Sequence, residues 1–195
     1  MASIINLNDP RARRTRRLIH QAFVELLSQK DFESITIQDI SDHAEMNRTT
    51  FYSHFQDKYE LLELTLNTMF SDILVSWIPE NKEMTLQDLV RNLMLAVCQW
   101  QIESGQKLNR KSILKPYIEE NTEKQLYTII FSCINRASAD SLGQNRQLEI
   151  AAAMLSSSIC GIVFHWSRKP QSESPEDLVQ HALPFILSIL RQIDL

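Results

Sequence analysis

Hydrophobic positions recur at helical spacing along most of this chain. The first stretch of this kind follows Asp9, which can cap a helix, and Pro10, which fits a first helical position, and it predicts a helix from residue 10 to about 29. Its apolar face is formed by Ile19, Ala22, Phe23, Leu26 and Leu27. Only three glycines and six prolines interrupt the 195 residues. Because these two residue types are the main helix breakers, the pattern favours an all-α fold.

Two short segments come next. Thr36 and Asp39 have the three-residue spacing of a capping box, with Asp in place of the usual Glu, and predict a short helix. Asn47 can cap another short helix, from Arg48 to about Phe55. Two short helices separated by a tight turn are typical of a helix-turn-helix unit.

The remaining two thirds of the chain are also predicted to be helical. A helix from Lys58 to about Trp77 is followed by apolar stripes within residues 86–100 and 126–137, and the stretch 148–166 is apolar nearly all round. Ser174 and Pro175 then open a last helix with acidic residues in its first turn. We expect about nine helices in all.

Several function classes find no support in the sequence. Residues 150–166 are uncharged but contain serines and fall short of the roughly 20 apolar residues that a membrane span needs, so we expect no membrane partner. Cys98, Cys133 and Cys160 lie too far apart for a metal or redox motif, and they are expected to be reduced thiols in the cytoplasm. No targeting signal, cofactor motif, metal site or catalytic group is predicted.

The charge is distributed unevenly. The net charge is −4, but residues 1–58 hold eight Lys and Arg against eight Asp and Glu, so all of the excess negative charge lies in residues 59–195. Arg11, Arg13, Arg14, Arg16 and Arg17 fall within seven consecutive positions. We call residues 1–58 the head and residues 59–195 the body. Because the head is neutral overall with a cluster of arginines and the body is acidic, only the head is able to bind DNA.

Residues 35–62, ITIQDISDHAEMNRTTFYSHFQDKYELL, closely resemble the helix-turn-helix of the TetR family of bacterial transcription regulators. The shared features are the Thr-x-x-Asp-Ile opening, the Thr-Phe-Tyr-x-His-Phe helix, the Asp-Lys step and the paired leucines. With the preceding helix, the resemblance covers residues 10–62. The Asn-Arg-Thr-Thr-Phe-Tyr run is similar to a branch of the family linked to dihydroxyacetone kinase operons.

The resemblance implies a three-helix DNA-binding domain in residues 1–58 and a helical effector-binding and dimerisation domain in residues 59–195. From the residues themselves, a helix capped by Asn47 presents Arg48 to the major groove, where two hydrogen bonds to guanine would contribute about 1–3 kcal/mol of discrimination. Thr49, Thr50 and Ser53 are short polar neighbours, and the arginines at 11–17 supply affinity for phosphate. The resemblance adds phosphate contacts from Tyr52, His54, Lys58, Thr36 and Gln38. The predicted DNA-binding residues are therefore Arg11, Arg13, Arg14, Arg17, Thr36, Gln38, Asn47, Arg48, Thr49, Thr50, Tyr52, Ser53, His54 and Lys58.

In the body, family resemblance suggests a cavity for a small apolar effector. Its candidate lining, which equally fits a filled core, is Phe70, Met94, Trp100, Tyr127, Phe131 and Trp166. His165 is either a buried core histidine or the polar group of such a pocket. Helices at about 147–168 and 175–193 are the expected homodimer interface, which would place two heads on an inverted-repeat operator.

One position departs from the family pattern: Glu45 follows Ala44 where the turn usually carries glycine. A left-handed Glu45 would cost about 1 kcal/mol. A repressor is the default expectation. The alternatives are an activator whose body binds a protein partner, and a helical enzyme that uses Cys98, Cys133 or His165.

Overall fold

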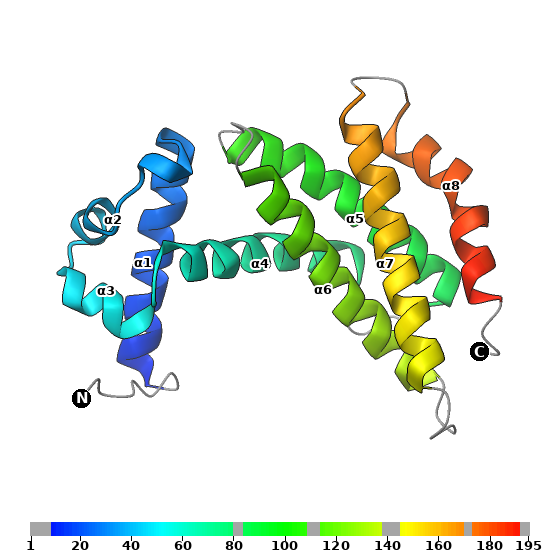
Figure 1. Ribbon diagram of the computed structural model, residues 1–195, viewed down its shortest axis with the longest axis horizontal. Coiled ribbons are helices and arrows are strands. Elements are labelled where there is room, and N and C mark those ends of the chain that lie inside the picture. Colours follow the sequence, from blue (N-terminus) through cyan, green and yellow to red (C-terminus); the bar gives the residue numbers. More distant parts are fainter. Residues whose placement is uncertain (1–8, 80–83, 109–113, 138–144, 170–172, 192–195) are drawn as a thin grey trace. The chain divides into compact units, whose positions relative to one another are not determined.

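The structure is a computed structural model that describes residues 9–79, 84–108, 114–137, 145–169 and 173–191. Within these residues the secondary structure is wholly helical, with eight α-helices and one 3-10 helix, which confirms the predicted fold class (Figure 1). The elements are α1 (Pro10–Gln29), the 3-10 helix η1 (Phe32–Ser34), α2 (Ile37–His43), α3 (Arg48–His54), α4 (Lys58–Trp77), α5 (Leu86–Lys107), α6 (Leu114–Ala137), α7 (Asn145–Ser167) and α8 (Pro175–Leu190).

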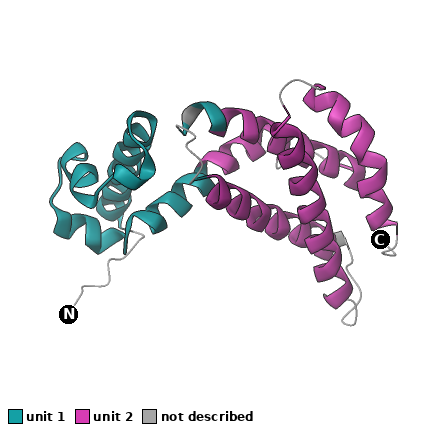
Figure 2. Cartoon of the chain, turned by 45° about the horizontal axis from the view of Figure 1, so that its top comes forward, with its two compact units in different colours: residues 1–68, 105–114 teal, residues 69–104, 115–195 magenta. Residues whose placement is uncertain are grey.

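The chain divides into two compact units (Figure 2). Unit 1 comprises residues 1–68 and 105–114, and unit 2 comprises residues 69–104 and 115–195. The division therefore falls within α4, and unit 1 continues past the boundary expected at residue 58. A physical reason is that the start of α4 packs in unit 1, where the Tyr59 ring meets the Phe32 ring edge-on at 5.2 Å.

The helix starts of unit 1 are those that the capping residues predict. The Asp9 carboxylate accepts a hydrogen bond from the Arg11 amide at 2.8 Å. At α2, the Thr36 hydroxyl accepts from the Asp39 amide and the Asp39 carboxylate accepts from the Thr36 amide, which completes the capping box. The Asn47 side chain accepts from the Thr50 amide at 2.8 Å. Each side chain satisfies an amide that has no partner inside its helix.

The core of unit 1 is formed by apolar side chains from all of its helices. Phe23 of α1, Ile40 of α2 and Phe51 of α3 are each at most 1% exposed. Ile37 is only partly buried. This shared core sets α2 and α3 against α1.

α2 ends in a Schellman turn. The Met46 amide donates to the Ser41 carbonyl at 2.8 Å, and the Glu45 amide donates to the Asp42 carbonyl at 3.1 Å. Glu45 occupies the left-handed position of this turn, with φ of 55°. The structure therefore places in the left-handed region the residue that stands where the family usually has glycine.

Unit 2 is built around the buried residues of α5, α6 and α7. Trp100 is 1% exposed, and its indole N–H donates to the Thr122 hydroxyl at 2.9 Å. α7 packs against α8, and Ser174 caps α8 through the Asp177 amide. Among the described residues, α7 is also the one helix long and apolar enough to cross a membrane by length and composition alone, although half of that window is buried within the chain.

Candidate nucleic-acid interface

α3 has one buried face and one exposed face. Phe51 and Phe55 are 1% and 2% exposed and anchor the helix and its C-cap in the core of unit 1. Arg48, Thr49 and Tyr52 are exposed. α3 therefore presents a polar outer edge on an apolar base, as a helix that enters the major groove must.

Arg48 is held along this outer edge by Tyr52, one turn later. A guanidinium nitrogen of Arg48 donates to the Tyr52 hydroxyl at 3.5 Å, and its guanidinium carbon lies 5.9 Å from the centroid of the Tyr52 ring. At these lengths the contact is weak, and exposed cation–π contacts contribute only about 0.5–1 kcal/mol. Arg48 is thus oriented but remains free to exchange the tyrosine hydroxyl for a base edge.

Two other hydroxyl groups of α3, those of Thr50 and Ser53, make hydrogen bonds within the helix or to its N-cap. The Thr50 hydroxyl donates to the Asn47 side chain at 3.0 Å, and the Ser53 hydroxyl donates to the Thr50 carbonyl at 2.7 Å. A hydroxyl has only one hydrogen to donate. Thr50 and Ser53 therefore fit the contact surface better as small groups that permit close approach than as donors to phosphate.

The arginines of α1 are not equivalent. Arg11, Arg13, Arg14 and Arg17 are exposed, as a phosphate-binding role requires. Arg16 is half-buried, and its guanidinium donates to the carbonyl of His54 at 2.7 Å. The sequence analysis counted Arg16 in the basic cluster at positions 11–17 but did not include it among the predicted DNA-binding residues. The signal that separates it is helical spacing, because position 16 falls on the buried stripe that includes Ala12, Ile19 and Phe23.

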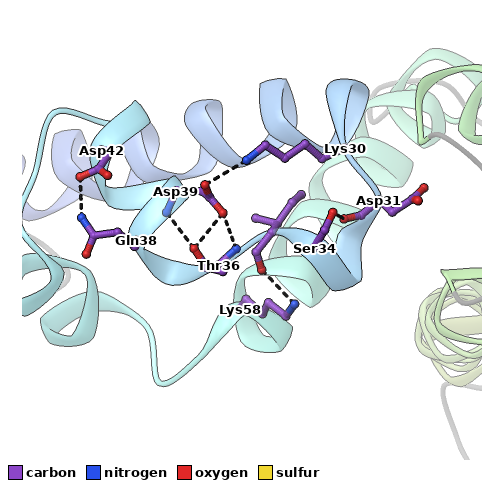
Figure 3. Close-up of polar contacts among 9 residues, drawn as sticks. Lys30, Asp31, Ser34, Thr36, Gln38, Asp39, Asp42 and Lys58 are labelled. Carbon is purple, nitrogen blue, oxygen red and sulfur yellow. Dashed lines mark hydrogen bonds and ion pairs between the residues drawn. The ribbon is translucent and has the colours of Figure 1, made fainter.

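The predicted contacts at the start of α2 form a polar network (Figure 3). The Thr36 hydroxyl donates to the Asp39 carboxylate at 2.8 Å, and Lys30 pairs with the same carboxylate at 2.9 Å. The backbone amide of Thr36, then Lys30 and the Thr36 hydroxyl, lower the pKa of Asp39 well below its usual range. Gln38 is exposed and bonds to Asp42 at 2.6 Å, so its side chain lies at the surface at the start of α2.

Lys58 has a different role from the predicted phosphate contact. Its ammonium group donates to the carbonyls of Phe32, Glu33 and Ile35 at 3.0, 3.2 and 2.9 Å. It also lies 4.5 Å from the Phe32 ring centroid. Because an ammonium has three donors and all three are taken, we leave Lys58 out of the contact set.

His54 is half-buried and uncharged near neutral pH. Burial, and then the positive charge of Arg16, lower the pKa of its imidazole below the ordinary value. Its buried Nδ1 has no hydrogen-bond partner in the described part of the chain. A phosphate contact from His54 would therefore rely on one neutral N–H rather than on charge.

The structure places the residues proposed to line an effector pocket in three groups. Phe70, Met94 and Trp100 are at most 1% exposed, and the rings of Phe70 and Trp100 pack 5.8 Å apart in the core. Tyr127 stacks on Phe131 at 5.9 Å between ring centroids. Tyr127 lines a surface depression of about 450 Å³ between α6 and α7, whereas Trp166 lines another of about 510 Å³ between α7 and α8. His165 is exposed in the second depression and is not a core histidine.

Two of the three thiols, those of Cys98 and Cys160, give no support to a cysteine enzyme. Burial raises the pKa of Cys98 to about 12, and it raises the pKa of Cys160 as well. A nucleophilic cysteine needs the opposite shift. Within the described residues, no group of three or more His, Cys, Asp or Glu side chains is placed to hold a metal ion.

In comparisons with known proteins, the part of the chain that contains α2 and α3 matches a family model. Residues 19–65 match the family model described as bacterial regulatory proteins, tetR family. A 67-residue stretch is 37% identical to YxbF of Bacillus subtilis (strain 168), an uncharacterized HTH-type transcriptional regulator, and covers 34% of this chain and 18% of that protein. A 60-residue stretch is 32% identical to DhaS of Lactococcus lactis subsp. lactis (strain IL1403), an HTH-type dhaKLM operon transcriptional activator, and covers 31% of this chain and 32% of that one. These matches thus span less than two thirds of either relative.

The likeness of fold extends over the whole chain. The crystal structure of a TetR transcriptional regulator from Streptococcus agalactiae 2603V superposes with a TM-score of 0.56, covering 92% of this chain and 97% of that one at 21% identity. At this identity the likeness concerns the fold alone. Over 92% of its length, this chain therefore has a helical fold similar to that of this protein.

Proposed function

Since this chain belongs to the TetR family of bacterial regulatory proteins through its N-terminal helix-turn-helix, we propose that it is a sequence-specific transcription regulator that binds an inverted-repeat operator as a homodimer. The observation that carries the proposal is the division of α3 into a buried aromatic face and an exposed face that carries Arg48. The exposed arginines of α1 supply the sequence-independent attraction to the DNA backbone. The family consists of DNA-binding regulators and not of enzymes.

The test compares two arginines in one binding assay. The operator duplex is first located by nuclease protection of the DNA upstream of the protein's own gene. Arg48→Ala is expected to lower affinity for the operator by about 1–3 kcal/mol while leaving affinity for random DNA nearly unchanged, because it removes one base contact. Arg14→Ala is expected to weaken binding to both duplexes alike. If neither substitution changes binding, α3 and α1 do not contact DNA in this way.

The homodimer rests on the exposed apolar side chains of the last two helices. Met154 of α7 is 50% exposed and Phe185 of α8 is 76% exposed. Ile150, one turn before Met154 on α7, is 46% exposed as well, and neighbouring exposed apolar side chains of this kind are what a partner covers. We infer that α7 and α8 pair with their copies in a second chain, so that the recognition helices enter successive major grooves about 34 Å apart. Residues 192 and 193 of the expected interface lie outside the described residues.

The sign of regulation has two candidates. A repressor is the first, and an activator whose body binds a protein partner is the second, favoured by the likeness to the activator DhaS. A reporter fused to the protected promoter in a deletion strain distinguishes them. Its expression rises if the protein is a repressor and falls if it is an activator.

We also propose a small-molecule effector bound in the body of the protein. This part of the proposal rests on family resemblance, and among the six candidate residues Tyr127 and Trp166 line two different surface depressions. An effector would act in the cytoplasm by changing the separation of the two heads and thus the population competent to bind DNA. Compounds are first screened for those that raise the unfolding temperature of the protein. A compound that does so and also releases the protein from its operator would support this part.

A further inference from the structure

Of the five arginines at the start of α1, Arg16 alone is only half-exposed. It shares the inward stripe of α1 with Ala12, Ile19 and Phe23, all of which are buried. Its guanidinium lies over the Phe55 ring, with 4.2 Å from its carbon to the ring centroid. Arg16 is therefore directed into unit 1, in the direction of the end of α3.

The group that Arg16 binds is the last carbonyl of α3. His54 is the final residue of this helix and Phe55 is its C-cap. The 2.7 Å hydrogen bond from Arg16 to the His54 carbonyl satisfies an acceptor that has no partner inside the helix. A cation at this end also opposes the partial negative charge of the helix dipole. One guanidinium thus makes a hydrogen bond, a ring contact and a favourable charge interaction at the same helix end.

We propose that Arg16 is a positioning residue that fixes the end of α3 on α1 and so sets how Arg48 meets the bases, without itself binding phosphate. This inference rests on the proposed function. α3 has only seven residues, so a change at its end moves its outer edge relative to α1, which carries the phosphate-binding arginines. Arg16 would then contribute to the choice of sequence, whereas Arg14 would contribute only to affinity.

A lysine cannot replace Arg16 in this role. The planar guanidinium lies over the Phe55 ring while one of its N–H groups donates to the His54 carbonyl. A lysine ammonium is a compact point charge without that flat fork. Arg16→Lys therefore keeps the positive charge but loses the planar group that contacts Phe55 and His54 together. It separates an effect of the charge on DNA binding from an effect of these contacts.

The experiment measures affinity for the operator and for a random duplex of equal length, by fluorescence anisotropy over a range of salt concentrations. Arg16→Gln is compared with its matched control, Arg14→Gln, in the full-length protein. The control is expected to reduce the slope of log affinity against log salt by about 0.9 for each lost phosphate contact and to leave the operator-to-random ratio unchanged. Arg16→Gln and Arg16→Lys are expected to keep the slope and to lower the ratio by about five- to a hundredfold, the discrimination of one misaligned bidentate contact.

The ratio also separates positioning from a loss of folding. Partial unfolding of the head lowers affinity for both duplexes by the same factor and leaves the ratio unchanged. A retained ratio for both Arg16 variants would overturn the proposal, whether or not the slope falls, and if Arg16→Gln does not fold, Arg16→Lys decides alone. A wild-type ratio near one would instead refute the proposed function, and this inference with it, before any variant is compared.

Discussion

Replacing Glu45 by glycine is expected to stabilise unit 1. Glu45 is exposed and holds φ at 55° in the turn between α2 and α3. The left-handed region costs a residue with a Cβ about 1–2 kcal/mol. Glycine avoids this cost but loses about 0.5–1 kcal/mol through its greater freedom in the unfolded chain. The expected net gain for Glu45→Gly is thus about 0.8 kcal/mol, the middle of a range of about 0–1.5 kcal/mol.

Glu45→Ala is the matched control, because it removes the carboxylate and keeps the Cβ. Glu45 lies just beyond the negative end of the α2 dipole, so loss of its charge alone would stabilise the turn slightly. Both variants lack the carboxylate, so the difference between their free energies of unfolding reports only the strain of a Cβ-bearing residue in the left-handed region, less the entropic cost of glycine. For a unit of 60–100 residues, each kcal/mol raises the melting temperature by about 4–8 °C.

The measurement is urea unfolding followed by far-UV circular dichroism, with the change in midpoint read at constant slope. Tryptophan fluorescence is unsuitable, because Trp77, Trp100 and Trp166 all lie in unit 2 and do not report on the head. A glycine variant no more stable than the alanine variant would show that the left-handed turn carries no strain at Glu45.

Three further predictions concern the interface, the capping box and the thiols. Phe185→Asp should raise the dimer dissociation constant by about two to four orders of magnitude in sedimentation equilibrium, since each of two buried phenylalanines contributes about 1.5–3 kcal/mol; an unchanged dimer would exclude this face of α8. The pKa of Asp39 is depressed on folding, so its contribution is complete above the ordinary carboxyl value of 3.8 and is lost as the pH falls. Asp39→Asn should therefore be less stable than the wild type at pH 7. In thermal melts at a series of pH values, the difference in stability between the two proteins should disappear as the pH falls below 3.8. A difference that does not change with pH would contradict the capping role of the Asp39 carboxylate. In the native protein, iodoacetamide followed by mass spectrometry should label Cys133 well before Cys98 and Cys160, because the last two are buried with raised pKa values; equal labelling would show that unit 2 opens readily.

The sequence predicted unit 1 well where the signals are local. The cap at Asp9 and the capping box at Thr36 gave the starts of α1 and α2, and Asn47 gave that of α3. Each is a bond between residues two or three positions apart, so the residue types and their spacing are sufficient to identify it. The left-handed turn at Glu45 could be anticipated for the same reason.

The contacts that depend on tertiary packing could not be predicted in this way. Lys58 bonds to carbonyls 23 to 26 positions earlier, and Arg16 bonds to a carbonyl 38 positions later. In unit 2, helical periodicity shows that Phe70 and Trp100 face inward, but not whether the space between inward side chains is filled. In the structure, the rings of Phe70 and Trp100 pack against each other. The sequence alone fitted a filled core and a pocket equally well at these positions.

Arg16 and Lys58 together change the expected electrostatics of DNA binding. α2 and α3 have seven residues each, well below the roughly 12–15 at which a helix becomes marginally stable alone, so tertiary contacts must hold them. Both cations supply such contacts by donating to carbonyls at the ends of short elements. If these two are structural, the exposed arginines at positions 11, 13, 14 and 17 are the phosphate-binding set.

This set limits the salt dependence that the protein can show. Four phosphate contacts in each of two heads give a slope of log affinity against log salt of about −7, whereas six contacts, with Arg16 and Lys58 included, would give about −11. The difference is large enough to measure on random DNA, where base contacts do not contribute. A slope near −11 that falls on substitution of Lys58 would show that these cations leave their carbonyls to bind DNA, and that the head is held together in some other way when it is bound.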